Sequence, residues 1–302
     1  MNPNIRGIIG APPTPFTSDN RLDGPTFQRL VDFLIRHGVH GLALPMHVGE
    51  SLNLSAEERR ELARLAVEAA SGRVPVLIHT GLPGTDEVVA LSRHAQSIGA
   101  WGVVVITPYY WQPQRADLLD HFVAVASALE ISMMGYNSPH HLGVSLTPDI
   151  LKELIERCPN FVGLKDASFD MEYFIEACRV TSEARPGFAV FTGMEYLLTS
   201  MPAGGAGAFS FYGVAPRLIK ALYDACAARD YERARPLQYK VSQLRNILKV
   251  GSPATVKAAL EIMGRSLGPT RRPLPAVSPE RRAYIRTQLE ELDILQTEPH
   301  GW

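Results

Sequence analysis

Hydrophobic and polar positions follow two patterns along this chain. Eight short runs are almost continuously apolar, and between them lie longer segments in which apolar side chains recur every three or four residues. Short unbroken apolar runs are typical of parallel strands covered on both faces, whereas the longer pattern is typical of amphipathic helices. The predicted strands are 8–11, 41–45, 74–79, 102–107, 131–136, 161–165, 188–192 and 206–211.

A helix is predicted after every one of these strands. Segment 55–70, for example, opens with Ser55 and has Glu58 three residues later, the pattern of a capping box. The other predicted helices of this series are 24–37, 86–98, 116–129, 148–157, 171–182, 196–202 and 216–228. Eight strand–helix units without a hairpin predict an α/β fold, a closed (β/α)₈ TIM barrel. A doubly wound open sheet competes with it, but the first strand leads into APPTPF, not into a Gly-x-Gly-x-x-Gly turn.

After residue 230 the pattern is purely helical. Helices are predicted at 231–249, 254–263 and 279–292. Because no segment of flexible composition separates them from the barrel, we expect one barrel over 1–230 and a C-terminal helical appendix over 231–302 that packs on it.

Composition removes several classes of protein. The 302 residues are 46% hydrophobic, and 30 basic against 31 acidic side chains give a net charge of −1 without long runs of one sign. A folded core is therefore expected, and neither nucleic acid nor a membrane surface is an expected partner. Cys158, Cys178 and Cys226 form no Cys-x-x-Cys pair, and the N-terminus, MNPNIRGIIGAPPTPF, resembles no secretory signal. We therefore expect a cytoplasmic protein.

In a barrel of this kind, functional side chains lie at the carboxyl ends of strands and in the loops that follow. Lys165 ends the apolar run FVGLK, where a neutral amine could attack a ketone and form a Schiff base; a pairing with Asp166 or another carboxylate is the alternative. Tyr136 ends the preceding run and could move protons, or could merely pack its ring. The other candidates at such positions are Thr14, His47, Glu50, His79, Thr80, Tyr109, Tyr110, Asn137, 192–195 and Ser210.

Several segments in this order resemble the dihydrodipicolinate synthase and N-acetylneuraminate lyase family of class I aldolases. They are GVHGLALPMHVGES, TPYY, GYNSPHHLG, GLKDAS and GGAGAFS, followed by VKAALEIMG and RRPLP in the C-terminal helices. The resemblance implies that Lys165 forms the Schiff base with pyruvate or another 2-oxo acid and that Tyr136 is the proton shuttle. It further implies that Tyr110 is the relay partner, that Tyr109 reaches a neighbouring subunit in a dimer of dimers, and that the stretch with Gly207, Phe209 and Ser210 approaches the oxo acid.

The chain departs from the family pattern in two places. Where the family usually has Gly-Thr-Thr-Gly-Glu, residues 46–50 are MHVGE, so His47 could replace one hydroxyl and Val48 offers only its backbone N–H. Where dihydrodipicolinate synthases carry an arginine that clamps a substrate carboxylate, this chain has His141. An imidazole lacks the bidentate fork of a guanidinium, so condensation with aspartate semialdehyde is disfavoured.

After the seventh predicted strand, Glu195 resembles the carboxylate position with which sugar-acid members of the family hold substrate hydroxyls, and Gly193 is a further substrate-binding candidate of the same segment. A surface glutamate at a helix start would explain Glu195 equally well. His47, His79 and the pair His140 and His141 raise a zinc alternative, although their spacing matches no metal motif and a Schiff-base lysine needs no metal. We expect no cofactor beyond the covalent adduct on Lys165.

The sequence therefore predicts a lyase that cleaves a 2-keto-3-deoxy sugar acid to pyruvate and an aldehyde. Three alternatives stay open: dehydration of a 2-oxo-3-deoxy acid through the same iminium, condensation of the 4-hydroxy-tetrahydrodipicolinate synthase type, and a non-catalytic 2-oxo acid binding protein. With so little net charge, selectivity for an anionic substrate would have to come from local groups.

Overall fold

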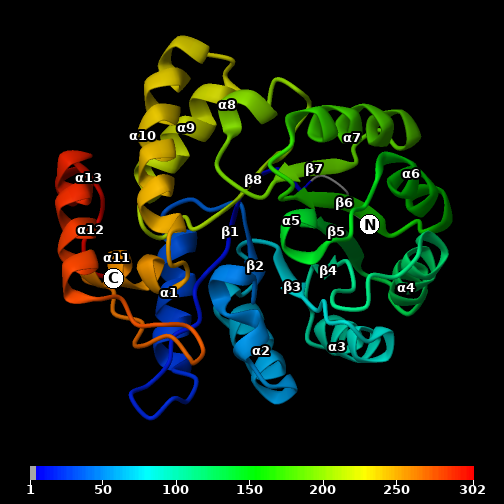
Figure 1. The fold of residues 1–302 in the computed structure, drawn as a ribbon, viewed down its shortest axis with the longest axis horizontal. Coiled ribbons are helices and arrows are strands. Elements are labelled where there is room, and N and C mark those ends of the chain that lie inside the picture. Colours follow the sequence, from blue (N-terminus) through cyan, green and yellow to red (C-terminus); the bar gives the residue numbers. More distant parts are fainter. Residues whose placement is uncertain (1–4) are drawn as a thin grey trace. The chain divides into compact units, whose positions relative to one another are not determined.

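The computed structural model describes residues 5–302 and confirms the predicted (β/α)₈ barrel (Figure 1). Within that range, strands follow one another around a closed barrel in chain order. They are β1 (Gly7–Gly10), β2 (Gly41–Leu44), β3 (Val76–His79), β4 (Gly102–Ile106), β5 (Ser132–Asn137), β6 (Phe161–Asp166), β7 (Ala189–Thr192) and β8 (Gly207–Ser210). All of their residues are buried, which is why these runs are almost continuously apolar.

Helices follow the strands as predicted. They are α1 (Gly24–Arg36), α2 (Ala56–Ala70), α3 (Thr85–Ser97), α4 (Arg115–Ser127), α6 (Pro148–Arg157), α7 (Met171–Ala184), α8 (Leu197–Ser200) and α9 (Pro216–Ala227). The capping box of α2 is confirmed, since the Glu58 N–H donates to Ser55 Oγ and the Ser55 N–H donates to the Glu58 carboxylate. Four single turns were not predicted, because they are too short to show a periodic pattern: η1 (His47–Gly49), η2 (Ser51–Asn53), α5 (Pro139–Leu142) and α13 (Ile294–Thr297).

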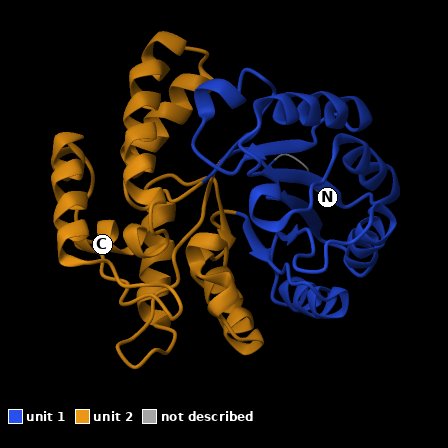
Figure 2. Cartoon of the chain, in the orientation of Figure 1, with its two compact units in different colours: residues 1–7, 75–209 blue, residues 8–74, 210–302 orange. Residues whose placement is uncertain are grey.

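The described chain divides into two compact units (Figure 2). Unit 1 contains residues 5–7 and 75–209, and unit 2 contains residues 8–74 and 210–302. In unit 1 each strand from β3 to β7 pairs in parallel with the next. Helices α3, α4, α6 and α7 form the outer layer of this unit, each packed against its neighbour in that order (Figure 1).

In unit 2, β1 pairs in parallel with β2, and α1 packs against α2. The predicted C-terminal helices are present as α10 (Tyr231–Lys249), α11 (Ala254–Ile262) and α12 (Pro279–Glu291), and α10 packs against α9, α11 and α12. Residue 230, the predicted boundary of the barrel, falls between α9 and α10. Residues 1–4, which the prediction included in the barrel, lie outside the described residues. None of the helices within 5–302 has the length and apolar character needed to cross a membrane.

Candidate active site

Two neighbouring strands of unit 1 bring Lys165 and Tyr136 together. The residues are register partners on β6 and β5, so their side chains leave the sheet on the same face. Lys165 Nζ lies 3.6 Å from the centroid of the Tyr136 ring and 5.4 Å from the centroid of the Phe209 ring. Both Lys165 and Tyr136 are buried, with exposed fractions of 6% and 7%. A lysine amine thus lies among aromatic rings near the carboxyl end of a central strand.

Asp166 belongs to a separate hydrogen-bond network. Its carboxylate accepts hydrogen bonds from Asn137 Nδ2 at 2.9 Å, from the Ser168 N–H at 3.1 Å and from Ser168 Oγ at 2.9 Å. Burial raises the pKa of the Asp166 carboxyl, although these hydrogen bonds act in the opposite direction. Successive residues of a strand point to opposite faces, so Asp166 leaves β6 on the side away from Lys165. The alternative that Lys165 pairs with Asp166 is therefore wrong.

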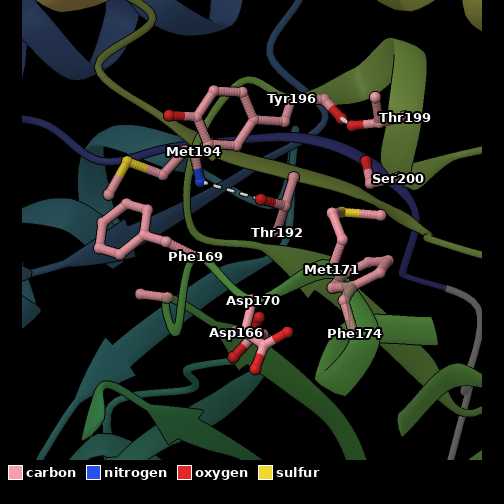
Figure 3. A pocket seen from close by; sticks show the side chains of 11 residues that line it. Asp166, Phe169, Asp170, Met171, Phe174, Thr192, Met194, Tyr196, Thr199 and Ser200 are labelled. Carbon is pink, nitrogen blue, oxygen red and sulfur yellow. Dashed lines mark hydrogen bonds between the residues drawn. The ribbon is translucent and has the colours of Figure 1, made fainter. Parts of the chain in front are cut away.

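Asp166 also borders a pocket of about 280 Å³ in unit 1, which lies beside α7 and α8 (Figure 3). The 11 side chains that line it are aromatic, thioether, hydroxyl, carboxylate or methyl groups, and none is basic. They are Asp166, Ala167, Phe169, Asp170, Met171, Phe174, Thr192, Met194, Tyr196, Thr199 and Ser200. A pocket with carboxylates and without a cation does not suit an anionic oxo acid, so we do not place the substrate there.

His79 lies beside Tyr136, although the resemblance gave it no role. It ends β3, is 4% exposed, and its ring centroid is 6.0 Å from that of Tyr136 with the two ring planes 69° apart. The Tyr136 phenol ring is thus contacted by Lys165 and by an imidazole in the same unit. A histidine that closes the apolar run VLIH was the sequence feature that could have indicated this neighbour.

The segment after β7 contains two of the predicted substrate-binding residues. The Gly193 N–H donates to the Asp166 carbonyl at 2.5 Å, and a Cβ at position 193 would lie 2.8 Å from that of Ala167. Only glycine allows this close approach of the chain after β7 to the end of β6. Glu195 is 1% exposed, so the alternative of a surface glutamate is wrong. Gly207, another predicted substrate-binding residue of unit 1, is buried on β8.

The predicted residues on loops lie apart from this buried group. Tyr110 is 83% exposed and has a left-handed backbone with φ 76°, and its ring centroid is 5.0 Å from that of the exposed Trp111. Tyr109 is half-buried. His141 is exposed on α5, and its Nδ1 lies 3.1 Å from Ser138 Oγ. The relay, interface and substrate-binding roles expected for Tyr110, Tyr109 and His141 stay predictions.

Unit 2 carries the remaining predicted residues. His47 is exposed and Val48 half-buried on η1, directly after β2, whereas Ser210 is buried at the end of β8. The turn ends at Glu50, whose carboxylate forms an ion pair of 2.6 Å with Lys257 Nζ on α11. This partner of Glu50 was not predicted, because Lys257 lies within the helical pattern VKAALEIMG and far away along the chain.

No group of three or more His, Cys, Asp or Glu side chains within residues 5–302 is placed to hold a metal ion. The three-histidine alternative therefore gains no support. Instead, the closed (β/α)₈ barrel and the buried lysine beside a tyrosine define the class as an enzyme of the class I aldolase type.

Comparison with known proteins agrees with this class. The model of the dihydrodipicolinate synthetase family matches residues 4–292, and the chain belongs to that family. It is 37% identical to a 4-hydroxy-tetrahydrodipicolinate synthase of Methanoculleus marisnigri, over 94% of this chain and 98% of that protein. It is 35% identical to YagE of Escherichia coli K12, provisionally named a 2-dehydro-3-deoxy-D-gluconate aldolase, over 95% of this chain and 97% of the relative.

Solved structures show the same similarity. The crystal structure of YagE in complex with pyruvate superimposes with a TM-score of 0.92 at 34% identity, over 96% of this chain and 99% of that one. A dihydrodipicolinate synthase from Acinetobacter baumannii complexed with pyruvate gives a TM-score of 0.90 at 30% identity, over 96% of this chain and 100% of the other. The protein is thus a pyruvate-dependent Schiff-base lyase or synthase of this family.

Proposed function

We propose that this enzyme cleaves a 2-keto-3-deoxy sugar acid to pyruvate and an aldehyde through a Schiff base on Lys165. The observation that carries the proposal is the position of the Lys165 amine, buried beside the Tyr136 and Phe209 rings. Because Asp166 is bound by Asn137 and Ser168 on the other face of β6, the amine is not held in that ion pair. It is therefore available to attack a carbonyl carbon.

The reaction needs one nucleophile and one group that moves protons. The Lys165 amine adds to C2 of the substrate, and Tyr136 donates the proton with which the C2 oxygen leaves as water, which gives a protonated imine and leaves Tyr136 able to accept a proton. Tyr136 then removes the proton of the C4 hydroxyl, the C3–C4 bond breaks, and its electrons flow to the imine to leave an enamine and the aldehyde. Protonation of the enamine at C3 and addition of water release pyruvate and restore the Lys165 amine.

The preference for a sugar acid rests on the departures from the family pattern. His141 replaces the arginine that would clamp a semialdehyde carboxylate, and His47 and Val48 replace two hydroxyls. We propose His47, Val48, His141, Gly193, Glu195, Gly207, Phe209 and Ser210 as the substrate-binding residues. The name given to YagE supports a sugar-acid substrate. Condensation is the second candidate, because the relative from Methanoculleus marisnigri, which is 37% identical to this chain, is named a 4-hydroxy-tetrahydrodipicolinate synthase.

A screen over 2-oxo acids tests the proposal. Each acid is incubated with the protein and borohydride, and intact mass shows whether a reduced adduct forms. Product analysis then separates the reactions, because cleavage of 2-keto-3-deoxygluconate releases pyruvate and glyceraldehyde, whereas dehydration keeps all carbons in one product. We expect pyruvate to form an adduct and the sugar acid to be cleaved. A condensation product from pyruvate and aspartate semialdehyde, without cleavage of any sugar acid, would contradict the assignment.

Assembly and organisation are part of the proposal. We propose a dimer of dimers in which Tyr109 lies at the closer interface and Tyr110 serves as the relay partner, and a barrel of residues 1–230 with an appendix of 231–302. Light scattering on the purified protein tests the tetramer. We also propose that the enzyme is cytoplasmic and uses no cofactor besides the adduct on Lys165. The thiols of Cys158, Cys178 and Cys226 are buried and unpaired, as is usual in a reducing compartment.

A further inference from the structure

Unit 2 contains a buried ion pair that the proposed reaction does not use. Lys257 Nζ lies 2.6 Å from the Glu50 carboxylate, and the side chains are 4% and 0% exposed. Burial lowers the pKa of the Lys257 ammonium, and the neighbouring Glu50 carboxylate opposes that shift. Removing two ions from water costs as much as their attraction returns, and an apolar pair of the same size often stabilises a fold equally well. Fold stability alone therefore does not explain why two charged side chains are buried at this place.

Glu50 links two consecutive turns of the backbone. It joins the turns η1 and η2, and its own backbone is left-handed with φ 55°, a conformation that a residue with a side chain adopts only when its surroundings hold it there. Its N–H donates to the His47 carbonyl at 3.0 Å. On the other side of the turn, Thr14 Oγ1 donates to the Gly49 carbonyl at 2.6 Å. The backbone of Glu50 is thus part of the hydrogen-bonded turn that carries His47 and Val48.

The Glu50 side chain is held from the C-terminal part of unit 2. Besides the ion pair with Lys257, its carboxylate accepts a hydrogen bond from the Arg271 N–H at 2.8 Å. Lys257 itself is fixed by donation to the Pro269 carbonyl at 2.8 Å and by the Phe16 ring, whose centroid is 4.5 Å from Nζ. Helix α11 and the segment that follows it therefore determine where the Glu50 carboxylate, and with it the turn, can lie.

We propose that the Glu50–Lys257 pair is a positioning device that fixes the turn carrying His47 and Val48, and so determines how tightly the enzyme holds the sugar part of its substrate. This inference rests on the proposed function, because it takes His47 and Val48 as substrate-binding residues. Glu50 and Lys257 act through the turn and are positioning residues, not catalytic ones. They are not expected to affect formation of the Schiff base.

The double variant E50Q/K257M tests the inference, because it removes both charges and leaves neither ion unpaired. We expect KM for 2-keto-3-deoxygluconate to rise at least tenfold, while kcat changes less than threefold and the borohydride-trapped pyruvate adduct forms as in the wild type. His47→Ala is expected to have a smaller effect on KM in this background than in the wild type, since the turn is already displaced. A KM within twofold of wild type, with the full effect of His47→Ala, would overturn the inference.

A matched control lies on the same helix. Glu261 of α11 forms an exposed ion pair with Arg282 of α12, so E261Q/R282M also removes one charge of each sign, one of them from α11, and should leave KM unchanged. Should E50Q/K257M fail to fold, E50D shortens the carboxylate by one methylene and should raise KM in the same direction by a smaller factor.

Hydrogen–deuterium exchange separates failure of this inference from failure of the proposed function. If the wild type cleaves no sugar acid, the proposed function is wrong, yet exchange in residues 46–53 still reports on the turn. Faster exchange there in E50Q/K257M, but not in E261Q/R282M, would support the positioning role. Unchanged exchange in that segment would overturn it whatever the substrate.

Discussion

Two buried lysines of this enzyme differ in what surrounds them. Lys165 on β6 is 6% exposed and lies beside the rings of Tyr136 and Phe209, whereas Lys257 on α11 is 4% exposed and lies against the Glu50 carboxylate. Lys257 also donates to the carbonyl of Pro269. The two lysines are similarly buried, but of the two only Lys257 is held by a carboxylate and a carbonyl.

The difference teaches that burial alone does not make a lysine reactive. An ion pair and a backbone hydrogen bond hold the Lys257 nitrogen in one place, and the Glu50 carboxylate favours the ammonium form, which has no lone pair to attack a carbonyl. Lys165 Nζ lies beside aromatic rings and forms no ion pair with the adjacent Asp166, because that carboxylate points to the other face of β6. In this pair of lysines, contact with a carboxylate distinguishes the structural Lys257 from the proposed nucleophile Lys165.

The largest effect is expected from removing the Lys165 amine. Lys165→Met should lower turnover by at least ~10⁴-fold, because no other group can form the Schiff base. Steady-state cleavage assays give the size of the loss. Lys152 on the exposed side of α6 provides the control, and Lys152→Met should retain wild-type turnover. Comparable turnover in Lys165→Met and wild type would contradict the assignment of Lys165 as the nucleophile that forms the Schiff base.

Replacing Lys257 should lower the stability of the fold. Lys257→Met leaves the Glu50 carboxylate buried without its partner, which should lower the free energy of unfolding by ~3–5 kcal/mol. Urea denaturation followed by circular dichroism measures the change. Glu261→Gln, which breaks the exposed pair with Arg282 on the same helix, should cost no more than ~1 kcal/mol. Equal free energies of unfolding in the two variants would show that the buried pair contributes no more to stability than the exposed one.

Tyr136→Phe isolates the hydroxyl from the ring. The ring that lies 3.6 Å from Lys165 Nζ remains, so the fold and the place of the amine should be kept. Loss of the group that moves protons should lower kcat by ~10²–10³-fold, as usual for a general base. Pre-steady-state cleavage of the preformed adduct measures this step. His79→Phe, which keeps a ring beside Tyr136, should change kcat far less, and an equal loss would transfer the proton role to the imidazole.

A third buried base shows the effect of desolvation without any charged partner. Burial alone lowers the pKa of His121 from 6.5 to about 4. Its stabilising contribution is complete above pH 6.5, where both folded and unfolded states are neutral, and declines as pH falls towards 4 because only the unfolded state takes up the proton. Unfolding free energy should therefore drop by about 2 kcal/mol more between pH 7 and pH 5 in wild type than in His121→Gln. Parallel pH profiles of the two proteins would contradict this.

Local patterns explain why the fold was predictable. The runs that became β1 to β8 are mostly apolar, as is typical of parallel strands covered on both faces, and Ser55 with Glu58 marks a helix start by itself. The turn η1 and the single-turn helix α5 escaped prediction, because three or four residues show no period. Both carry residues that we interpreted as departures from the family pattern, namely His47 and His141.

The candidate site was predictable only in part, for a geometric reason. Tyr136 and Lys165 end consecutive strands, so their neighbourhood follows from the order of the strands. Strand alternation also shows that Asp166 cannot share a face with Lys165, and the sequence alone would have allowed that conclusion. The Glu50–Lys257 pair joins residues far apart in the chain, and no local pattern indicates such a contact.

Peptide mapping after borohydride trapping compares the two buried lysines most directly. The protein is incubated with pyruvate, reduced, digested and analysed by mass spectrometry, so that each lysine is read separately. The contrast between Lys165 and Lys257 predicts one reduced adduct, on the peptide that contains Lys165, and an unmodified peptide that contains Lys257. An adduct on Lys257, or an unmodified Lys165 under conditions that label another member of the family, would contradict it.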